Sequence, residues 1–505
     1  MRTKKAIYNS ISKLLYEVVA AVSGLILPRL ILSNFGSDYN GVIASISQFI
    51  GYTSLLTAGV GGVTQASLYK SLADHDTIKI SGILRATEIF MQKVAIIFIF
   101  GLIGFASLYP VLVRDEFDWF FTFSLVLILG IGTFAQYFFG ITFKTLLGAD
   151  QREYIPTLIS TLTTLINTAV AVALIHVGSE IRVIKLASAL VFAGNPIFIN
   201  IYVRKRYKII HSIEPDNSAI KQRWDAFAHQ IANFVNNNTD IIILTVFTGI
   251  MEVSVYSIYY LVINNIRTII TSLMGQGLAA AFGSMIAKNE HKNIHNSLRL
   301  YEFMSGSLSV LFFTCTAVLI VPFISVFTKG VKDADYFQPL FAYLACAAQC
   351  LYVLRLPYQS LVLAAGHFRQ TRNGAIMEAA INIIVSLLLV QSLGLVGVTI
   401  GTLCAMVFRT VQYALYMSRH IVLRSIRIVV RKLLLYAFHA CAIIVLAQLL
   451  PKMNETTYIA WILYALPVFG VATGVTALLA VLFYRKEIQM LTRNIRHAFQ
   501  RKETK

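Results

Sequence analysis

Long apolar runs separated by short polar links repeat along almost the whole chain. Most runs hold about 18 to 28 residues, enough to cross about 30 Å of hydrocarbon at about 1.5 Å per residue in a helix. The runs are continuous rather than alternating, which argues against a β-barrel and favours helices, whose backbone groups bond within the segment. The pattern predicts an all-α polytopic membrane protein of about fourteen spans. The expected spans are residues 7–33, 41–68, 88–112, 119–143, 155–177, 183–203, 226–248, 253–283, 301–327, 337–365, 374–391, 395–417, 433–450 and 457–484.

Composition agrees with this class. Hydrophobic residues are 57% of the chain and charged residues 13%, whereas about 25% of residues are charged in soluble domains. The five cysteines all lie within apolar runs, where we expect packing residues rather than disulfides or metal ligands. The sequence has no G-x-x-x-x-G-K-[ST] phosphate loop and no nucleophile-and-base set that could be placed from sequence. We therefore expect no enzyme activity, no metal and no cofactor.

Basic residues follow an alternating distribution. With the N-terminus and every second loop placed in the cytoplasm, these segments hold 31 of the 43 Lys and Arg residues, and the opposite loops hold five. Cytoplasmic loops of membrane proteins carry this excess, so the bias predicts a multi-pass protein with both termini inside. Most of the net charge of +19 is thereby explained. The basic tail is expected to contact membrane lipids rather than nucleic acid.

Several sequence features recur at an offset of about 215 residues. Leu84-Arg85-x-x-Glu88 returns as Leu298-Arg299-x-x-Glu302, and Ile166-Asn167 returns as Ile381-Asn382. Both copies start in the cytoplasm, which predicts two parallel six-helix repeats. The expected organisation is an N-terminal lobe at 1–210, a second lobe at 211–425, and two additional helices with a basic tail at 426–505. Transporters built from repeats bind substrate between the halves.

Three stretches resemble a known superfamily of membrane transporters. They are LPRLILSNFGSDYNGVIASISQFIGYTSLLTAGVGGVTQASLYKSLA at 27–73, NNNTDIIILTVFTGIMEVSVYSI around Asp240, and INIIVSLLLVQSLGLVGVTIGT at 381–402. The chain resembles the multidrug/oligosaccharidyl-lipid/polysaccharide (MOP) exporter superfamily, most closely its bacterial polysaccharide-flippase branch. The resemblance covers about the first 420 residues. It implies a two-lobe V shape, as in the MATE transporters, and alternating access. It also implies transport of undecaprenyl-diphosphate-linked oligosaccharides across the bacterial inner membrane, for surface polysaccharides such as O-antigen, with H⁺ or Na⁺ coupling.

Seven basic residues lie within the spans, and depth sorts them. Lys13, Lys93 and Arg409 lie near cytoplasmic ends, and Arg29 and Lys185 near outer ends, where long side chains reach water. Only two lie about 10 or more residues from both ends of their spans. These two are Arg267 and Arg355.

Arg267 and Arg355 are the leading substrate-binding candidates. Tyr260, Asn264 and Arg267 recur at helical spacing, which predicts a polar stripe turned away from lipid. Guanidinium groups suit a diphosphate because they bind it with two parallel hydrogen bonds. The alternative for each arginine is a structural salt bridge between helices. Arg29 is a further substrate-binding candidate, and together with Pro28 it could mark a hinge in the first helix or a simple bend.

Polar side chains also follow one face of the seventh span. They are His229, Asn233, Asn236, Asn237 and Asp240. Asp240 could pair with Arg267 or Arg355, or bind the coupling ion. The alternative is a hydrogen-bonded seam between helices.

The eleventh and first spans complete the predicted polar network. Glu378, Asn382 and Ser386 form a similar face on the eleventh span. Glu17 lies in the first span, one helical turn from Lys13, and we expect the two to pair.

These features favour a flippase for an anionic lipid-linked oligosaccharide, with a polysaccharide polymerase and glycosyltransferases as expected partners. The alternative is a cation-coupled multidrug or metabolite exporter of the same fold, which should carry an acidic cavity. A membrane-embedded glycosyltransferase is a weaker hypothesis, because the outer loops are short. The sequence does not give the sugar, the oligomeric state or a role for the last two helices.

Overall fold

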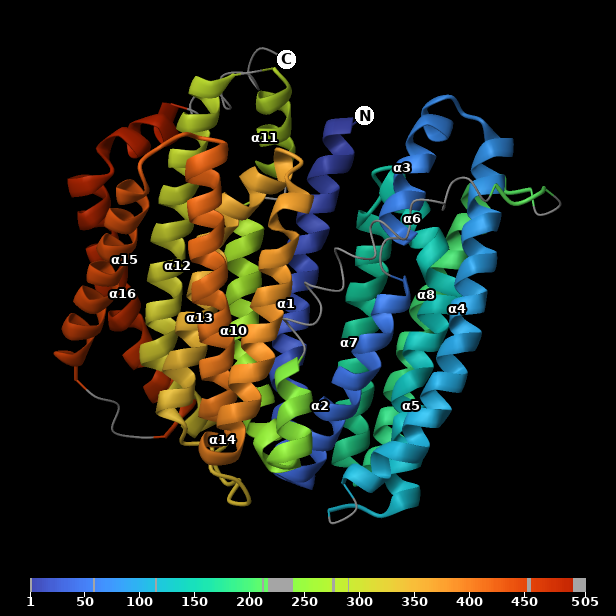
Figure 1. The fold of residues 1–505 in the computed structure, drawn as a ribbon. Coiled ribbons are helices and arrows are strands. Elements are labelled where there is room, and N and C mark those ends of the chain that lie inside the picture. The colour runs from blue at the N-terminus through green and yellow to red at the C-terminus, as the bar shows by residue number, and fades with distance from the viewer. Residues whose placement is uncertain are drawn as a thin grey trace. The chain divides into compact units, whose positions relative to one another are not determined.

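A computed structural model describes residues 2–57, 60–113, 116–210, 213–216, 239–274, 278–288, 290–451 and 456–493 (Figure 1). Within these ranges the regular elements are helices, with no strand. The chain forms two compact units, Met1–Ser254 and Val255–Lys505. The predicted lobe boundary at 210 stays a prediction.

Unit 1 holds the first eight helices, which pack around apolar side chains. Asp76 and Asp118 cap the starts of α4 and α5 by accepting hydrogen bonds from backbone N–H groups within the first turn. The helices are α1 (Arg2–Phe35), α2 (Ser37–Tyr52), α3 (Val60–Ala73), α4 (Thr77–Leu112), α5 (Trp119–Ala135), α6 (Ile141–Ala149), α7 (Tyr154–His176) and α8 (Ile181–Arg206). A 3₁₀ segment, Thr53–Thr57, follows α2, and a π-helical segment, Gln136–Gly140, joins α5 to α6.

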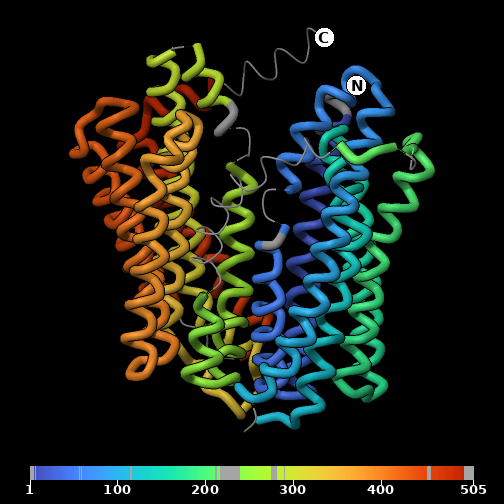
Figure 2. Tube along the Cα trace, turned by 45° about the vertical axis from the view of Figure 1, so that its right-hand side comes forward, coloured from blue at the N-terminus to red at the C-terminus, as the bar shows by residue number. Residues whose placement is uncertain are grey.

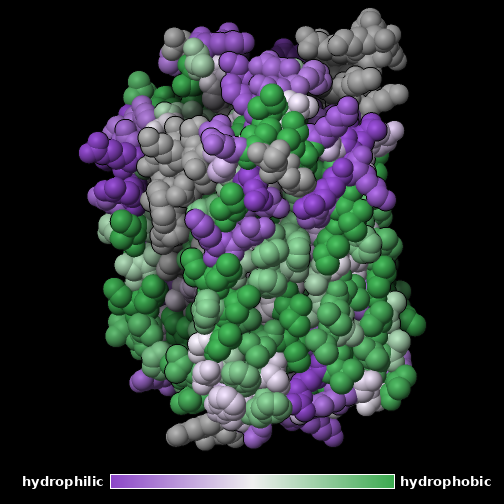
Figure 3. Space-filling view, turned by 90° about the vertical axis from the view of Figure 1, so that its right-hand side faces the viewer, coloured by the Kyte–Doolittle hydropathy of each residue, from purple (hydrophilic) through white to green (hydrophobic). Residues whose placement is uncertain are grey.

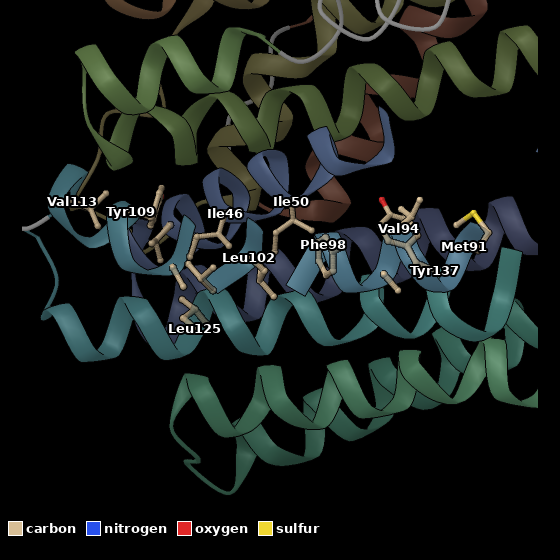
Figure 4. Close-up of a cluster of buried hydrophobic side chains, with 14 of the residues drawn as sticks. Ile46, Ile50, Met91, Val94, Phe98, Leu102, Tyr109, Val113, Leu125 and Tyr137 are labelled. Carbon is tan, nitrogen blue, oxygen red and sulfur yellow. The ribbon is translucent and has the colours of Figure 1, made fainter. Parts of the chain in front are cut away.

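One core cluster of unit 1 lies where α2, α4 and α5 meet. Ile46 of α2, Phe98 and Tyr109 of α4, and Leu125 of α5 are all fully buried (Figure 4). The ring of Phe98 meets Tyr137 edge-to-face at 5.5 Å between centroids. Such aromatic packing stabilises helix contacts inside a bilayer, where burial from water supplies no driving force.

Unit 2 contains α10 (Ile250–Met274, which begins in unit 1), α11 (Leu278–Ala287), α12 (His291–Phe327), α13 (Pro339–Ala364), α14 (Phe368–His420), α15 (Ile426–Gln448) and α16 (Tyr458–Phe483). α14 is two helices joined at Gly394, where φ is +51° and the chain reverses (Figure 2). Asn382 Nδ2 donates to Thr402 Oγ1 at 2.9 Å, and Ser386 Oγ donates to the Val398 carbonyl at 3.2 Å. The predicted spans 374–391 and 395–417 thus form a hairpin, which we call the α14 hairpin.

Ten described helices are long and apolar enough to cross a membrane, or eleven if α2 and α3 form one bent span. The α14 hairpin enters that count once although it covers two predicted spans. The predicted eighth span, 253–283, is divided between α10 and α11. Most of the predicted seventh span lies outside the described residues. The count of fourteen therefore stays a prediction, while the all-helical membrane architecture is confirmed.

Helix bounds recur along the chain at the offset found in the motifs. α4 begins at Thr77 and α12 at His291, 214 residues later. Gly36 precedes α2 with φ of +97°, and Gly249 precedes α10 with φ of +95°, 213 residues later. Only glycine adopts this backbone region freely, so both copies retain it at the same junction.

Large apolar side chains cover the lipid-facing surface of the helices. On α4, Phe100 is 72% exposed and Leu108 is 70% exposed. Figure 3 shows one face of the molecule, with apolar side chains over its middle and hydrophilic ones gathered toward both ends. An apolar belt of this size in water would aggregate, so it indicates a surface in contact with lipid.

We predict that Gly401→Ala destabilises the α14 hairpin. A Cβ at this position would lie 2.8 Å from the Ser386 backbone nitrogen and 2.9 Å from the Asn382 carbonyl oxygen. The two arms must move apart, at a cost of about 1–3 kcal/mol. Thermal unfolding of the purified protein in detergent should show a lower midpoint. Gly104→Ala is the matched control, because a Cβ there meets nothing within 4 Å. Equal midpoints for the two variants would contradict this packing.

Candidate functional site

A polar stripe on α13 carries the most deeply buried arginine of the predicted site. Gln349, Tyr352, Arg355 and Gln359 follow one another at steps of three and four, so they share one face of the helix. Arg355 is 4% exposed and forms a salt bridge with Glu378 of α14. A charge buried this deeply requires a partner of opposite sign, and the α14 hairpin supplies it.

Glu378 also binds a second arginine, Arg409, which lies on the other arm of the α14 hairpin. Arg409 Nε lies 3.2 Å from Glu378 Oε2, and both residues are 5% exposed. The expectation that Arg409 reaches water at the cytoplasmic end is therefore wrong. Its position along the helix suggested access to water, but the hairpin turns its side chain inward.

Arg409 is fixed by several further contacts. Its Nη1 donates to the Thr371 carbonyl at 3.1 Å and to Gln412 Oε1, and its Nη2 donates to Tyr413 Oη at 2.7 Å. Its guanidinium carbon lies 4.1 Å from the centre of the Tyr413 ring. These partners hold Arg409 in one geometry.

Arg267 of α10 reaches the same group of side chains. Its Nη1 donates to Gln349 Oε1 at 3.0 Å. Its guanidinium carbon lies 5.2 Å from the centre of the Tyr352 ring, and that of Arg355 lies 4.8 Å from the same ring. One tyrosine thus contacts two cations through its π face. We call Arg267, Arg355, Arg409 and Glu378 the arginine cluster.

The arginine cluster has an excess of positive charge in the apolar part of unit 2. It combines three arginines with one carboxylate, Glu378. Arg355, Glu378 and Arg409 lie nine, ten and eleven residues from the same end of their helices, which is about 15 Å along the helix axis. The Arg355 Nε–H has no hydrogen-bond acceptor among the described residues. The cluster therefore holds a buried donor that the described residues leave unused.

The other predicted residues of α10 have different neighbours. Tyr260 stacks on Tyr256 with ring centroids 4.1 Å apart, beside Phe341 of α13. Asn264 is half-buried, and its carbonyl accepts a hydrogen bond from Thr268. Arg267 is the member of the predicted stripe that contacts Gln349 and Tyr352 of α13.

The predicted polar network is divided between the two units. Asn382 is fully buried and binds the opposite arm of the α14 hairpin. In unit 1, Asp240 is 7% exposed and lies close enough to Tyr52 for an electrostatic interaction. Glu17 and Arg29 are half-buried on α1. His229, Asn233, Asn236 and Asn237 lie outside the described residues. The acid that pairs with Arg355 is Glu378 rather than Asp240.

A second buried ion cluster attaches the additional helices to α12. Glu302 is 2% exposed and binds Arg424 and Lys432, the latter at 2.6 Å. Burial of Arg424 opposes its charge, but the hydrogen bond and charge of Glu302 outweigh that effect and raise its pKa above the usual value. Arg299 Nη2 lies 2.7 Å from Glu487 Oε1.

The first copy of this repeated motif is paired differently. Arg85 and Glu88 bind each other at 3.1 Å. In the second copy the two residues bind other partners. Arg299 binds Glu487, which follows α16, and Glu302 binds Arg424, which precedes α15, and Lys432 within it. The additional helices thus change the partners of the repeated pair.

An apolar cavity of about 860 Å³ lies beside these helices in unit 2. Its lining comes from α12, α13, α15 and α16 and is mostly aliphatic and aromatic. The lining includes Phe313, Val318, Tyr343, Leu351, Leu433, Ala440, Ile444 and Tyr464. Because its walls are apolar, it suits a hydrocarbon chain better than a sugar. Among the described residues, no group of three His, Cys, Asp or Glu side chains could hold a metal ion.

Comparisons with known proteins identify the fold. No protein-family model and no curated protein matches the chain by sequence. The structure of the lipid II flippase MurJ in an inward closed conformation matches 95% of this chain and 100% of its own, with a TM-score of 0.69 and 15% identity. The MATE multidrug transporter DinF-BH, solved as a complex, matches 83% of this chain and 95% of its own, with a TM-score of 0.60 and 14% identity.

A eukaryotic MATE transporter, AtDTX14, matches 82% of this chain and 95% of its own, with a TM-score of 0.57 and 15% identity. These neighbours are transporters and a flippase rather than enzymes. The fold that the resemblance implied is therefore confirmed, while the polysaccharide-flippase branch stays a prediction. This multi-pass membrane protein has the fold of the MOP superfamily, shared by the lipid II flippase MurJ and the MATE transporters.

Proposed function

We propose that this protein is a flippase that moves an undecaprenyl-diphosphate-linked oligosaccharide across the bacterial inner membrane by alternating access, for cell-surface polysaccharide biosynthesis. The observation that carries the proposal is the arginine cluster, in which Arg355 and Arg409 bind one carboxylate, Glu378. Arg267 adds a third positive charge beside Gln349 and Tyr352 of α13. A net positive site at this depth suits an anionic group that must cross the membrane.

The chemistry of the cluster fits a diphosphate. A guanidinium presents parallel N–H donors that match phosphate oxygens, and it stays charged at this depth. Arg355 has a spare Nε–H donor, and Arg267 is half-buried. Since the neighbour MurJ is described as a lipid II flippase, a lipid-linked substrate is also compatible with this fold.

The apolar cavity supports a substrate with a hydrocarbon chain. It lies in the same unit as the arginine cluster, and α13 contributes to both. Leu351 and Leu354 line the cavity, while Tyr352 and Arg355 belong to the opposite face of the helix. We propose that part of the prenyl chain occupies this cavity while the diphosphate contacts the arginines. This gives α15 and α16 a role in substrate binding.

The alternative is a cation-coupled exporter of drugs or metabolites. The match to the MATE multidrug transporter DinF-BH favours it. Against it, the carboxylate of the cluster, Glu378, is neutralised by two arginines. A deletion strain that becomes drug-sensitive while keeping normal surface polysaccharide would support the exporter. We propose H⁺ or Na⁺ as the coupling ion, both termini in the cytoplasm, and a polymerase and glycosyltransferases as partners.

We predict that Arg267→Ala and Arg355→Ala each abolish surface polysaccharide without lowering the amount of protein in the membrane. Each variant removes donors that the diphosphate requires, and lysine should restore little because it cannot bind two oxygens in parallel. Complementation of a deletion strain with immunoblotting of membranes measures both quantities.

Lys93→Ala is the matched control, because Lys93 is an exposed basic residue of α4. It should leave polysaccharide unchanged. Normal polysaccharide in both arginine variants would contradict the proposed function.

We also predict that filling the apolar cavity blocks transport. Ala440 of α15 lines the cavity, and tryptophan at this position would occupy the space proposed for the prenyl chain. Polysaccharide export in the complemented strain should fall by about tenfold or more. Val445→Trp is the control, since Val445 lies on the same helix, is 58% exposed and does not line the cavity. Equal export by the two variants would show that the chain does not enter.

A further inference from the structure

The carboxylate of Glu378 bridges two arginines of the arginine cluster. Its Oε1 atom binds Arg355 of α13, and its Oε2 atom binds Arg409 of α14. A carboxylate that bridges two guanidinium groups uses the same donors, in the same planar arrangement, as a phosphate group does.

The two arginines are held unequally. Arg409 also binds the Thr371 carbonyl, Gln412 and Tyr413, so its position is fixed without Glu378. For Arg355, the structure records the Glu378 salt bridge and the Tyr352 ring, and its Nε–H has no acceptor among the described residues. Arg355 is therefore the arginine that can exchange its partner.

We infer that Glu378 is a built-in competitor for the phosphate group of the substrate. In the state described here its carboxylate neutralises Arg355, and a phosphate oxygen replaces it there when substrate binds. Glu378 then remains paired with Arg409. This inference rests on the proposed function, and it adds a residue that sets affinity and promotes release.

The exchange avoids the main cost of breaking a buried salt bridge. Removing one partner of such a pair is costly because the other charge is left uncompensated in a low-dielectric environment. Here Arg355 passes from one anion to another, and Glu378 keeps its contact with Arg409. When the substrate leaves, Glu378 returns to Arg355, so Arg355 is never left without an anionic partner. Release is thereby favoured over tight retention.

The test is the affinity of the purified full-length chain for inorganic pyrophosphate, measured by isothermal titration calorimetry. Glu378→Gln keeps the shape of the side chain and removes its charge. We expect this variant to bind pyrophosphate about tenfold more tightly than the wild type. Adding Arg355→Ala to the same chain should abolish the gain, because Arg355 is the group for which the two anions compete.

Glu302→Gln is the matched control. Glu302 is also a buried carboxylate with two cationic partners in unit 2, but it belongs to the ion cluster of α12, Arg424 and Lys432. Its variant should bind pyrophosphate as the wild type does. If Glu378→Gln does not fold, Glu378→Asp replaces it. The shorter carboxylate cannot bridge both arginines, so its affinity should still exceed that of the wild type.

Three results would overturn the inference. Equal affinity of the Glu378 variants and the wild type would show that no competition exists. An equal gain in Glu302→Gln would show a general effect of charge. If neither the wild type nor any variant binds pyrophosphate, both the anion site and the competition are refuted. If pyrophosphate binding behaves as expected but the wild type moves no lipid-linked oligosaccharide, the proposed function fails and the competition stands.

Discussion

A charged side chain within the hydrocarbon layer must have a partner, and this constraint organises unit 2. Insertion scales put the cost of a central charge at about 2.5–3.5 kcal/mol. Both buried ion clusters meet it by placing one carboxylate between two cations, Glu378 between Arg355 and Arg409, and Glu302 between Arg424 and Lys432. The Glu378–Arg409 salt bridge and the Asn382–Thr402 hydrogen bond join the two arms of the α14 hairpin and stabilise its observed register.

The two ion clusters differ in how many donors and how much positive charge remain for a ligand. Glu302 is enclosed by two cations and also lies beside Tyr436, whose hydroxyl donates to its carbonyl at 2.9 Å, so it joins α12 to the additional helices. The arginine cluster retains excess positive charge, a spare Arg355 donor and the half-buried Arg267. The first arrangement suits stability, and the second suits a transient anionic ligand. We propose that the apolar cavity near the first cluster gives the added helices a role in substrate binding.

Sequence patterns predicted much of this fold, because span length and repeat offset are local properties. The apolar runs located the helices, and the recurrence of Arg85–Glu88 at Arg299–Glu302 matched the recurrence of helix bounds. Depth along a span predicted correctly that Arg355 is buried. It failed for Arg409, because distance from a helix end does not say which way a side chain points. The pairing of Glu378 with two arginines depends on hairpin register, which spacing alone does not give. The polar stripe Gln349–Tyr352–Arg355 was readable from spacing and would have located the partner of Arg267.

The most direct test of the central claim is transport by the purified protein in liposomes. Fluorescent undecaprenyl-diphosphate oligosaccharide is placed in the inner leaflet, and its appearance outside is followed with a membrane-impermeant quencher. A lipid with the same sugar and chain but no phosphate is the comparison substrate. Binding through the arginine cluster predicts that the diphosphate lipid crosses and the neutral lipid does not, and that the double variant Arg267→Ala with Arg355→Ala moves neither. Equal transport of the two lipids, or full activity of the double variant, would contradict it.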